Sequence, residues 1–136
     1  MKSGISPWHG ACFAAVITFR FNVMKMIIAY IKPERLNAVK QELYMRRIYK
    51  MSVTNALGCG EQKGFVKAYR GAEVEVNLLK KVQLTIAVND EFVESTIQGI
   101  MAGAATGHIG DGKIFVLPLE RAIRIRTKEE NSGAIG

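Results

Sequence analysis

The sequence predicts a protein of the α+β class, in which four strands form one antiparallel sheet and two helices cover one of its faces. Three observations support this prediction. Four short segments have the composition of strands, amphipathic segments of helical period separate the first from the second and the third from the fourth, and a long polar stretch joins the middle two.

The first half of the chain contains a strand, a helix and a second strand. Residues 26–31 form a continuous apolar run, which indicates a buried strand. Pro33 follows it and suits the first turn of a helix. The inward positions of this helix are apolar and recur at i, i+3 and i+7: Leu36, Val39 and Leu43. Residues 51–57 alternate and are rich in β-formers, which predicts the second strand.

The second half repeats this pattern. Residues 82–88 alternate strictly between apolar and polar side chains and predict the third strand. Asn89 begins the second helix, with acids in its first turn, and the helix ends near Gly107. Its inward stripe comprises Phe92, Thr96, Ile100 and Ala104. Three segments complete the order: a fourth strand over 113–117, a last short strand over 122–126 and a flexible tail over 128–136.

The order βαββαβ is that of the ferredoxin-like sandwich. A chain of 136 residues fits one domain of this kind. One face of the sheet stays open in this arrangement, and oligomerisation is the simplest way to cover it. Between residues 61 and 80 the periodicity dissolves into Gly, Lys, Arg and Glu, which predicts a long loop that is mobile without a partner. Such a loop in a compact domain is usually functional or disordered.

The first 23 residues stand apart from this pattern. They contain an apolar run over 11–19, too short for a membrane span, and no clear cleavage site follows it. We expect Met24 to be the natural start, residues 1–23 to be an upstream extension and residues 24–136 to form the domain. A poorly ordered tail and a signal sequence are the alternatives.

The charge and the cysteines limit the classes of function. The net charge is +7, and from Met24 onward 17 cations face 12 carboxylates, which favours anionic partners such as nucleic acid, phosphorylated ligands or acidic metabolites. Cys12 and Cys59 lie far apart in the sequence and form no CxxC pair, so a zinc site or a disulfide framework is not expected. A reducing, cytoplasmic compartment fits this usage.

A glycine-rich segment before the fourth strand is the first candidate site. Gly107, Gly110 and Gly112 leave backbone N–H groups accessible to an anion, and Lys113 can neutralise a phosphate. The segment is not a Walker motif. A tight turn with an exposed lysine explains it equally well.

Two arginines near the C-terminus form the second candidate site. Arg124 and Arg126 are two positions apart, which would place them on one face of a strand. Guanidinium groups side by side repel one another, so an anionic partner is a reasonable expectation, and a solvated edge strand is the alternative. No set of residues typical of a nucleophile or an acid–base pair is apparent, so we expect no enzymatic activity.

Six motifs follow one another along the chain between Met24 and the C-terminus. They are Ile31-Lys32-Pro33, Gly60-x-Gln62-Lys63-Gly64, Tyr69-Arg70-Gly71-Ala72-Glu73, Leu79-x-Lys81-Val82, Thr106 with Gly110-Asp111-Gly112-Lys113-Ile114-Phe115-Val116, and Arg124-Ile125-Arg126-Thr127. Together they resemble the PII family of nitrogen-regulatory signal-transduction proteins, of the GlnB/GlnK type. The resemblance implies a homotrimer that is not an enzyme and that binds ATP and ADP in competition, in clefts between its subunits.

The resemblance also implies residues for these sites. The nucleotide would contact Ser52 and Ala87 at its adenine and Gly60, Glu61, Gln62, Gly110, Asp111, Gly112, Lys113, Arg124 and Arg126 at its phosphates. With Mg-ATP bound, 2-oxoglutarate would contact Gln62, Lys63, Gly64 and Lys81, and Gln62 would be a ligand of the Mg²⁺ ion.

The segment of about residues 60–80 would be the family's T-loop, which reports ligand state to a partner. Tyr69, Arg70 and Gly71 would contact that partner, an ammonium transporter or a nitrogen-assimilation enzyme such as glutamine synthetase or nitrogenase. The signal would arise because bound phosphates and a metal ion favour an ordered conformation of this loop.

Two residues depart from the family pattern. Val74 stands at the position of the family's modifiable tyrosine, so the hydroxyl for uridylylation is missing. Glu61 stands where many relatives carry an arginine, and a carboxylate there would repel both triphosphate and 2-oxoglutarate. We therefore expect regulation by ligands alone, and 2-oxoglutarate binding that is weak or absent.

The sequence fits two other classes of function, nucleic-acid-binding modules and enzymes, less well. A basic ferredoxin-like module can bind nucleic acid, but the central strands lack the aromatic pair of RNA-recognition modules, so no nucleic-acid partner is expected. An enzyme on this fold would need a catalytic set that the sequence does not offer.

Overall fold

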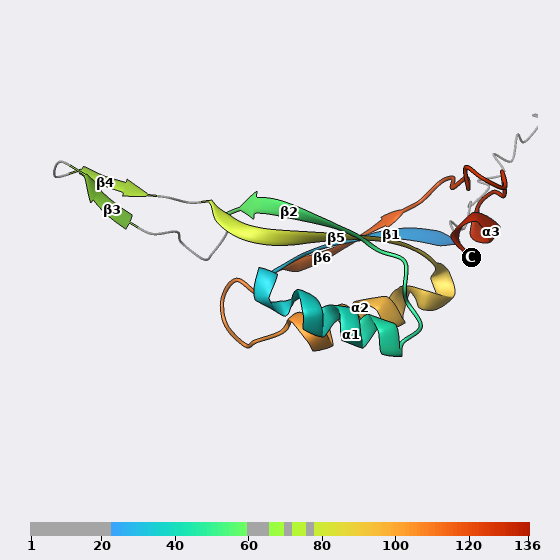
Figure 1. Cartoon of the computed structure of the whole chain (residues 1–136), viewed down its shortest axis with the longest axis horizontal. Coiled ribbons are helices and arrows are strands. Elements are labelled where there is room, and N and C mark those ends of the chain that lie inside the picture. Colours follow the sequence, from blue (N-terminus) through green and yellow to red (C-terminus); the bar gives the residue numbers. More distant parts are fainter. Residues whose placement is uncertain (1–22, 60–65, 70–71, 76–77) are drawn as a thin grey trace, which may run out of the picture.

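The computed structural model describes residues 23–59, 66–69, 72–75 and 78–136. Their elements in chain order are β1 (Met24–Ile31), η1 (Pro33–Arg35), α1 (Leu36–Met45), β2 (Ser52–Gly58), β3 (Val66–Tyr69), β4 (Ala72–Glu75), β5 (Leu79–Asn89), η2 (Asp90–Phe92), α2 (Val93–Ala104), β6 (Lys113–Pro118) and α3 (Ser132–Ile135) (Figure 1). The order of the main elements is the βαββαβ order that the sequence predicts.

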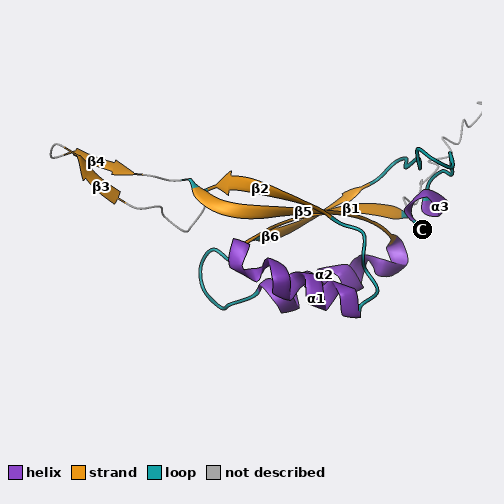
Figure 2. Ribbon diagram, in the orientation of Figure 1, coloured by secondary structure: helices purple, strands orange, loops and turns teal. Residues whose placement is uncertain are grey.

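Four strands form one sheet in the order β2-β5-β1-β6, and every neighbouring pair is antiparallel. Ile27 of β1 pairs with Ile86 of β5 on one side and with Val116 of β6 on the other. Helices α1 and α2 lie next to one another on one face of this sheet (Figure 2). The prediction of a ferredoxin-like α+β sandwich is confirmed.

The core lies between the sheet and the two helices. Its fully buried side chains come from alternate positions of the two central strands and from the helices: Ile27, Ala29, Ile31, Leu84, Ile86, Val39, Leu43, Thr96 and Ile100. Each buried Leu or Ile removes apolar area from water worth about 1.5–3 kcal/mol. The inward stripes read from the sequence are therefore confirmed for both helices. No helix in the ranges above is long and apolar enough to cross a bilayer.

The helices touch at a glycine. A Cβ atom at Gly103 of α2 would lie 2.5 Å from the Cα atom and 2.6 Å from the backbone nitrogen of Val39 in α1. Only the absence of a side chain at Gly103 allows the two backbones to approach so closely. The contact fixes the separation of the helices at this point.

The other face of the sheet, called the open face below, points away from the helices. Alternation along the strands places on it Ser52, Thr54, Met26, Ile28, Tyr30, Lys81, Gln83, Thr85, Ala87, Lys113, Phe115 and Leu117. Phe115 and Leu117 remain 48% and 43% exposed, and the rings of Tyr30 and Phe115 meet edge to face at 6.3 Å. An apolar stripe thus lies exposed on a single chain.

The C-terminal region differs from the sequence prediction. Residues 122–126 do not form a strand, and within the part of the chain that the structure describes their β-type contact is an isolated bridge between Ile123 and Glu130. The N–H of Leu119 bonds the carbonyl of Met24, and the chain leaves the sheet after this contact. Residues 122–126 pair with neither edge strand of the sheet, β2 or β6. The chain turns back on itself instead, and the tail that was expected to be flexible includes α3.

The long loop also contains more order than its composition suggests. β3 and β4 pair as an antiparallel hairpin, from Val66 opposite Glu75 to Tyr69 opposite Ala72. The two strands are joined by two residues, one of them a glycine, which is a favourable length for a hairpin turn. The prediction that residues 61–80 have no regular structure is therefore wrong for β3 and β4.

Candidate functional site

The segment between α2 and β6, residues 105–112, is called the glycine loop below. Gly107, Gly110 and Gly112 adopt positive φ angles of 79°, 97° and 105°. A side chain is unfavourable at such angles, which explains why glycine occupies these positions. Among the described residues, no acceptor meets the backbone N–H groups of Ile109 or Gly110. These donors are free to bind an anion.

Asp111 ties the two ends of the glycine loop together. Its Oδ2 accepts hydrogen bonds from the backbone N–H groups of Thr106, at 2.7 Å, and Gly107, at 3.0 Å. Its Oδ1 accepts a hydrogen bond from the Thr106 hydroxyl and forms an ion pair with Lys32 Nζ at 3.3 Å. Lys32 Nζ also donates to Thr106 Oγ1 at 3.2 Å. The loop is thus closed on itself and attached to the end of β1.

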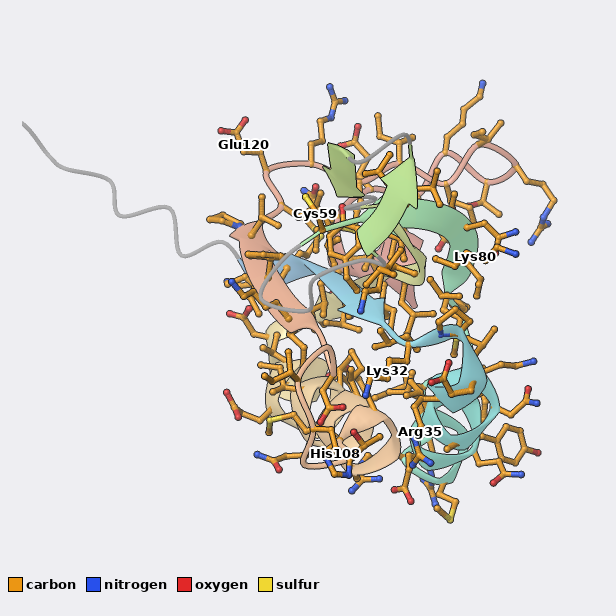
Figure 3. All side chains as sticks on the ribbon, turned by 90° about the vertical axis from the view of Figure 1, so that its left-hand side faces the viewer. Lys32, Arg35, Cys59, Lys80, His108 and Glu120 are labelled. Atoms are coloured by element: carbon orange, nitrogen blue, oxygen red, sulfur yellow. The ribbon has the colours of Figure 1, made fainter. Side chains whose placement is uncertain are left out.

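Figure 3 views this end of the molecule and shows Lys32 between the sheet and the loop that carries His108. Nearby, Arg35 Nε donates to the carbonyl of Gly103 at 2.8 Å, which satisfies a carbonyl at the end of α2. Lys32, which follows β1, therefore supports the glycine loop, and Arg35 of η1 supports the end of the helix that precedes it.

These contacts predict how stability depends on pH. The Thr106 hydroxyl, followed by the Thr106 N–H and then by Lys32 and Gly107, holds the pKa of the Asp111 carboxyl well below its ordinary value of 3.8, against a partial desolvation. A carboxyl whose pKa is lowered on folding stabilises the fold above its unfolded pKa and loses this contribution as the pH falls toward its folded pKa. We therefore expect Asp111→Asn to destabilise the protein at pH 6 and the difference from wild type to shrink as the pH falls below about 4. Denaturant titrations of both proteins across this pH range measure the difference in their free energies of unfolding. A difference that does not depend on pH would contradict the prediction.

Two lysines border the glycine loop. Lys81 of β5 donates from Nζ to the carbonyl of Gly110 at 2.9 Å. Lys113 begins β6, pairs with Tyr30 and has an exposed side chain. The structure thus brings together Gly110, Asp111, Gly112, Lys113 and Lys81 from the expected site residues. Of the two lysines, Lys81 has its ammonium group against the loop, at the carbonyl of Gly110.

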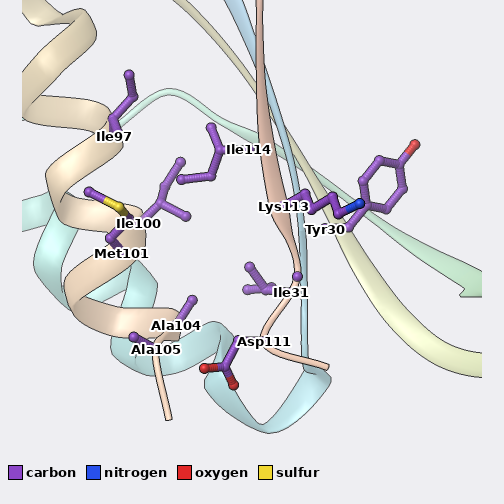
Figure 4. A pocket seen from close by; sticks show the side chains of 11 residues that line it. Tyr30, Ile31, Ile97, Ile100, Met101, Ala104, Ala105, Asp111, Lys113 and Ile114 are labelled. Carbon is purple, nitrogen blue, oxygen red and sulfur yellow. The ribbon is translucent and has the colours of Figure 1, made fainter. Parts of the chain in front are cut away.

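A cleft of about 290 Å³ lies behind this group, between α2 and the start of β6 (Figure 4). Its walls are mainly apolar, with Ile97, Ile100 and Met101 on the helix side and Ile114 on the strand side. Asp111 lies at one end of it, with its carboxylate directed to the loop. Apolar walls do not suit phosphates, so an anion would bind at the loop and not in this cleft.

Arg124 and Arg126 lie at the opposite end of the sheet. Lys113 pairs with Tyr30 near the end of β1, whereas Leu119 bonds to Met24 at its beginning. Six strand residues separate these positions, which is roughly 20 Å at the usual rise of a strand. One chain therefore does not bring Lys113 together with the two arginines (Figure 1).

Within one chain Arg124 binds the C-terminal segment. Its Nη2 donates to the carbonyls of Gly133 and Ala134, at 3.2 and 3.3 Å, and its Nη1 lies 3.3 Å from Glu129 Oε2. The same segment contacts the sheet, because Asn89 Nδ2 donates to the carbonyl of Ser132. The Arg126 side chain is exposed.

The remaining expected residues divide into three groups. Ser52 pairs with Thr85, and Ala87 with Met26, so both lie on the open face toward the arginine end of the sheet. Tyr69 ends β3 and Val74 lies in β4. The following expected residues lie outside the described residues: Gly60, Glu61, Gln62, Lys63, Gly64, Arg70 and Gly71.

Two residues of the site were not given a role from the sequence. Lys32 and Thr106 occur in the motifs quoted above, but their contacts with Asp111 depend on how β1, α2 and β6 are arranged. A lysine directly after a buried strand and before a proline is a weak signal that its charge has a local partner.

The sequence of this chain is similar to those of known proteins. A family model described as nitrogen regulatory protein P-II matches residues 24–129. The nitrogen regulatory protein GlnK1 of Methanosarcina mazei is 52% identical over 114 residues, which cover 82% of this chain and 97% of the relative. A nitrogen regulatory protein P-II of Haemophilus influenzae is 52% identical over 112 residues, 82% of this chain and the whole of the relative.

A solved structure is similar as well. The crystal structure of Arabidopsis thaliana PII bound to citrate matches with a TM-score of 0.68 and 33% sequence identity, and covers 82% of this chain and 89% of that one. The matched family segment begins at Met24, the first residue of β1.

Proposed function

The chain belongs to the nitrogen regulatory protein P-II family, and from this premise we propose that it is a trimeric regulator that binds ATP and ADP between its subunits. One observation carries the proposal. Lys113 with the glycine loop and Arg124 with Arg126 lie at opposite ends of one sheet, so an anion that contacts both groups must bind between two chains.

The open face supports assembly. Phe115 and Leu117 are about half exposed there, and β6 is an edge strand. A site that uses one end of a chain and the opposite end of the next fits a head-to-tail interface, and such an interface can close into a ring. A ring of three is the number that the family resemblance implies. Each ring then contains three equivalent sites.

A nucleotide suits the proposed site chemically. The adenine would lie against the open face at Ser52 and Ala87, and the phosphates would bind Lys113, the glycine loop and the arginines of the neighbouring subunit. Gln62 would be a ligand of Mg²⁺ held with ATP. The Arabidopsis relative is bound to citrate, which supports an affinity of the family's fold for carboxylate-rich anions.

We propose that 2-oxoglutarate binds weakly or not at all. Its expected contacts are Gln62, Lys63, Gly64 and Lys81, and the carboxylate of Glu61 lies next to them in the sequence. Like charges at this range reduce affinity unless a cation screens them. Lys81 is also engaged with the Gly110 carbonyl, which a 2-oxoglutarate carboxylate would have to displace.

The hairpin of β3 and β4 would carry the signal to a partner in the cytoplasm. In the sequence, residues 59–65 separate it from β2, residues 76–78 separate it from β5, and Arg70 lies between its two strands. Val74 offers no hydroxyl, so control would come from which ligand is bound, with ATP and ADP favouring different loop conformations. The partner would be an ammonium transporter or a nitrogen-assimilation enzyme.

Calorimetry tests this function. We expect ATP and ADP to bind with one site per chain and to compete with one another, because both offer phosphates to the same cations. An RNA oligonucleotide tests the rival reading of a nucleic-acid-binding module, and binding of RNA without ATP would contradict the proposal. 2-Oxoglutarate added to the Mg-ATP-saturated protein should give little or no heat, and Glu61→Arg should increase that heat.

A further inference from the structure

We infer that Asp111, Thr106 and Lys32 form a latch that positions the glycine loop for phosphate, and that Asp111 itself touches neither the nucleotide nor its metal. This inference rests on the proposed function and concerns the same site. It assigns a role to Lys32 and Thr106, and it changes the role expected for Asp111 from a ligand contact to a positioning residue.

The first argument is the hydrogen-bonding capacity of the carboxylate. An ionised aspartate offers about four acceptor positions on its two oxygens. In the latch Oδ2 receives two backbone N–H groups, of Thr106 and Gly107, and Oδ1 receives the Thr106 hydroxyl and the Lys32 ammonium. All four positions are filled from within the chain. A metal or a ligand donor would have to displace one of these contacts.

The second argument is the place of the contacts in the chain. Thr106 follows α2, Asp111 precedes β6 and Lys32 follows β1, so the latch joins the ends of three elements at the base of one loop. Thr106 Oγ1 also accepts a hydrogen bond from the backbone N–H of His108, at 3.3 Å. The latch thus fixes the first turn and the exit of the loop, while the N–H groups of Ile109 and Gly110 stay available. A loop ordered before binding does not pay its ordering cost when the ligand arrives.

The third argument is charge. Lys32 neutralises Asp111, and the Lys32 side chain is only 14% exposed. The pair therefore adds no net charge beside the loop, and we expect the exposed Lys113 to meet an anion. Removal of the Asp111 charge would by itself favour anion binding, whereas loss of the latch would weaken it. The two effects have opposite signs, which makes the proposal testable by one substitution.

The test measures ATP binding by calorimetry to wild type, Asp111→Asn and Thr106→Val, each in Mg²⁺ and in EDTA, well below the melting temperature of every variant. We expect both substitutions to weaken ATP about tenfold, by the same factor with and without the metal. Thr106→Ser should recover most of the factor lost in Thr106→Val, because it restores the hydroxyl. The double variant should lose little more than either single variant, because both break one unit.

The matched control is Asp90→Asn. Asp90 also pairs with a lysine, since its Oδ1 lies 2.9 Å from Lys25 Nζ, but it lies at the start of η2, at the other end of β1. This variant should bind ATP like wild type. An equal loss in Asp90→Asn would show a general effect of surface ion pairs and overturn the latch.

Other outcomes also decide the question. Tighter ATP binding by Asp111→Asn would mean that the carboxylate merely repels the ligand, and a loss confined to Mg²⁺ would mean that Asp111 is a metal ligand. Both overturn the inference. Amide hydrogen exchange of the ligand-free protein gives an independent readout. The N–H groups of Thr106, Gly107 and His108 are hydrogen-bonded within the latch. Their exchange should accelerate in Asp111→Asn and Thr106→Val and stay unchanged in Asp90→Asn. If the wild type binds no ATP, the proposed function fails, and unaccelerated exchange in both latch variants would overturn the latch separately.

Discussion

Replacing Gly112 with alanine is expected to destabilise the protein severely and to abolish nucleotide binding at the same time. A Cβ atom at this position would lie 1.6 Å from the carbonyl oxygen and 2.8 Å from the carbonyl carbon of Tyr30. Both atoms belong to the backbone of a central strand, so neither can turn away as a side chain would. The start of β6 would have to separate from β1.

The expected loss of stability in Gly112→Ala is the sum of two contributions. Overpacking of this kind costs about 1–3 kcal/mol or more, and a non-glycine residue at a φ of 105° adds about 1–3 kcal/mol of strain. Such a sum approaches the whole stability of a typical domain, about 5–15 kcal/mol. Urea denaturation followed by circular dichroism measures it.

Gly107→Ala is the matched control. Gly107 has a similar φ of 79°, but no atom lies within 4 Å of the Cβ position. This variant should therefore show only the strain and remain folded. Equal effects at both glycines would mean that backbone conformation, and not the contact with Tyr30, decides the outcome.

The second large effect concerns sites shared between chains. Lys113→Ala and Arg124→Ala should each weaken ATP binding by about tenfold or more, because charge-assisted contacts contribute about 1.5–3 kcal/mol each. When the two variants are unfolded together, mixed in equal amounts and reassembled, binding should return. An intact Lys113 from one chain can then meet an intact Arg124 from another.

The amount of recovered binding is also predicted. In a head-to-tail ring of three, each mixed ring regains one complete site, so random mixing restores roughly a quarter of the wild-type sites. Arg121→Ala, three positions from Arg124 and paired with Glu130, serves as the control and should bind normally. No recovery after mixing would show that Lys113 and Arg124 do not complete one site between chains.

The sequence predicted the elements well where burial controls them. The strict alternation at residues 82–88 and the helical stripe from Phe92 to Ala104 both describe a side of an element that faces the core, and the structure buries those sides. The alternation of residues 122–126 was misleading for the opposite reason. Ile125 is 95% exposed, so the pattern there does not reflect a core, and the bridge between Ile123 and Glu130 is an isolated one.

The arrangement of the site was less accessible from the sequence. The glycine angles of the loop could be expected, because only glycine adopts them without strain. The separation of Lys113 from Arg124 depends on the register between β1 and β6, which no local pattern specifies. The partners of Asp111 depend on three elements that are distant in sequence, and the pairing of β3 with β4 depends on a turn that the polar composition concealed.

The close approach of Gly103 to Val39 has a mechanical consequence. Two helices whose backbones interlock at one point resist sliding along one another, since any shift of one past the other would drive backbone atoms together. The helical layer then behaves as a stiff plate beneath the sheet. A displacement of the glycine loop would not be absorbed by shear between α1 and α2. It would instead reach the start of β5, which follows the hairpin in the sequence, through the contact of Gly110 with Lys81.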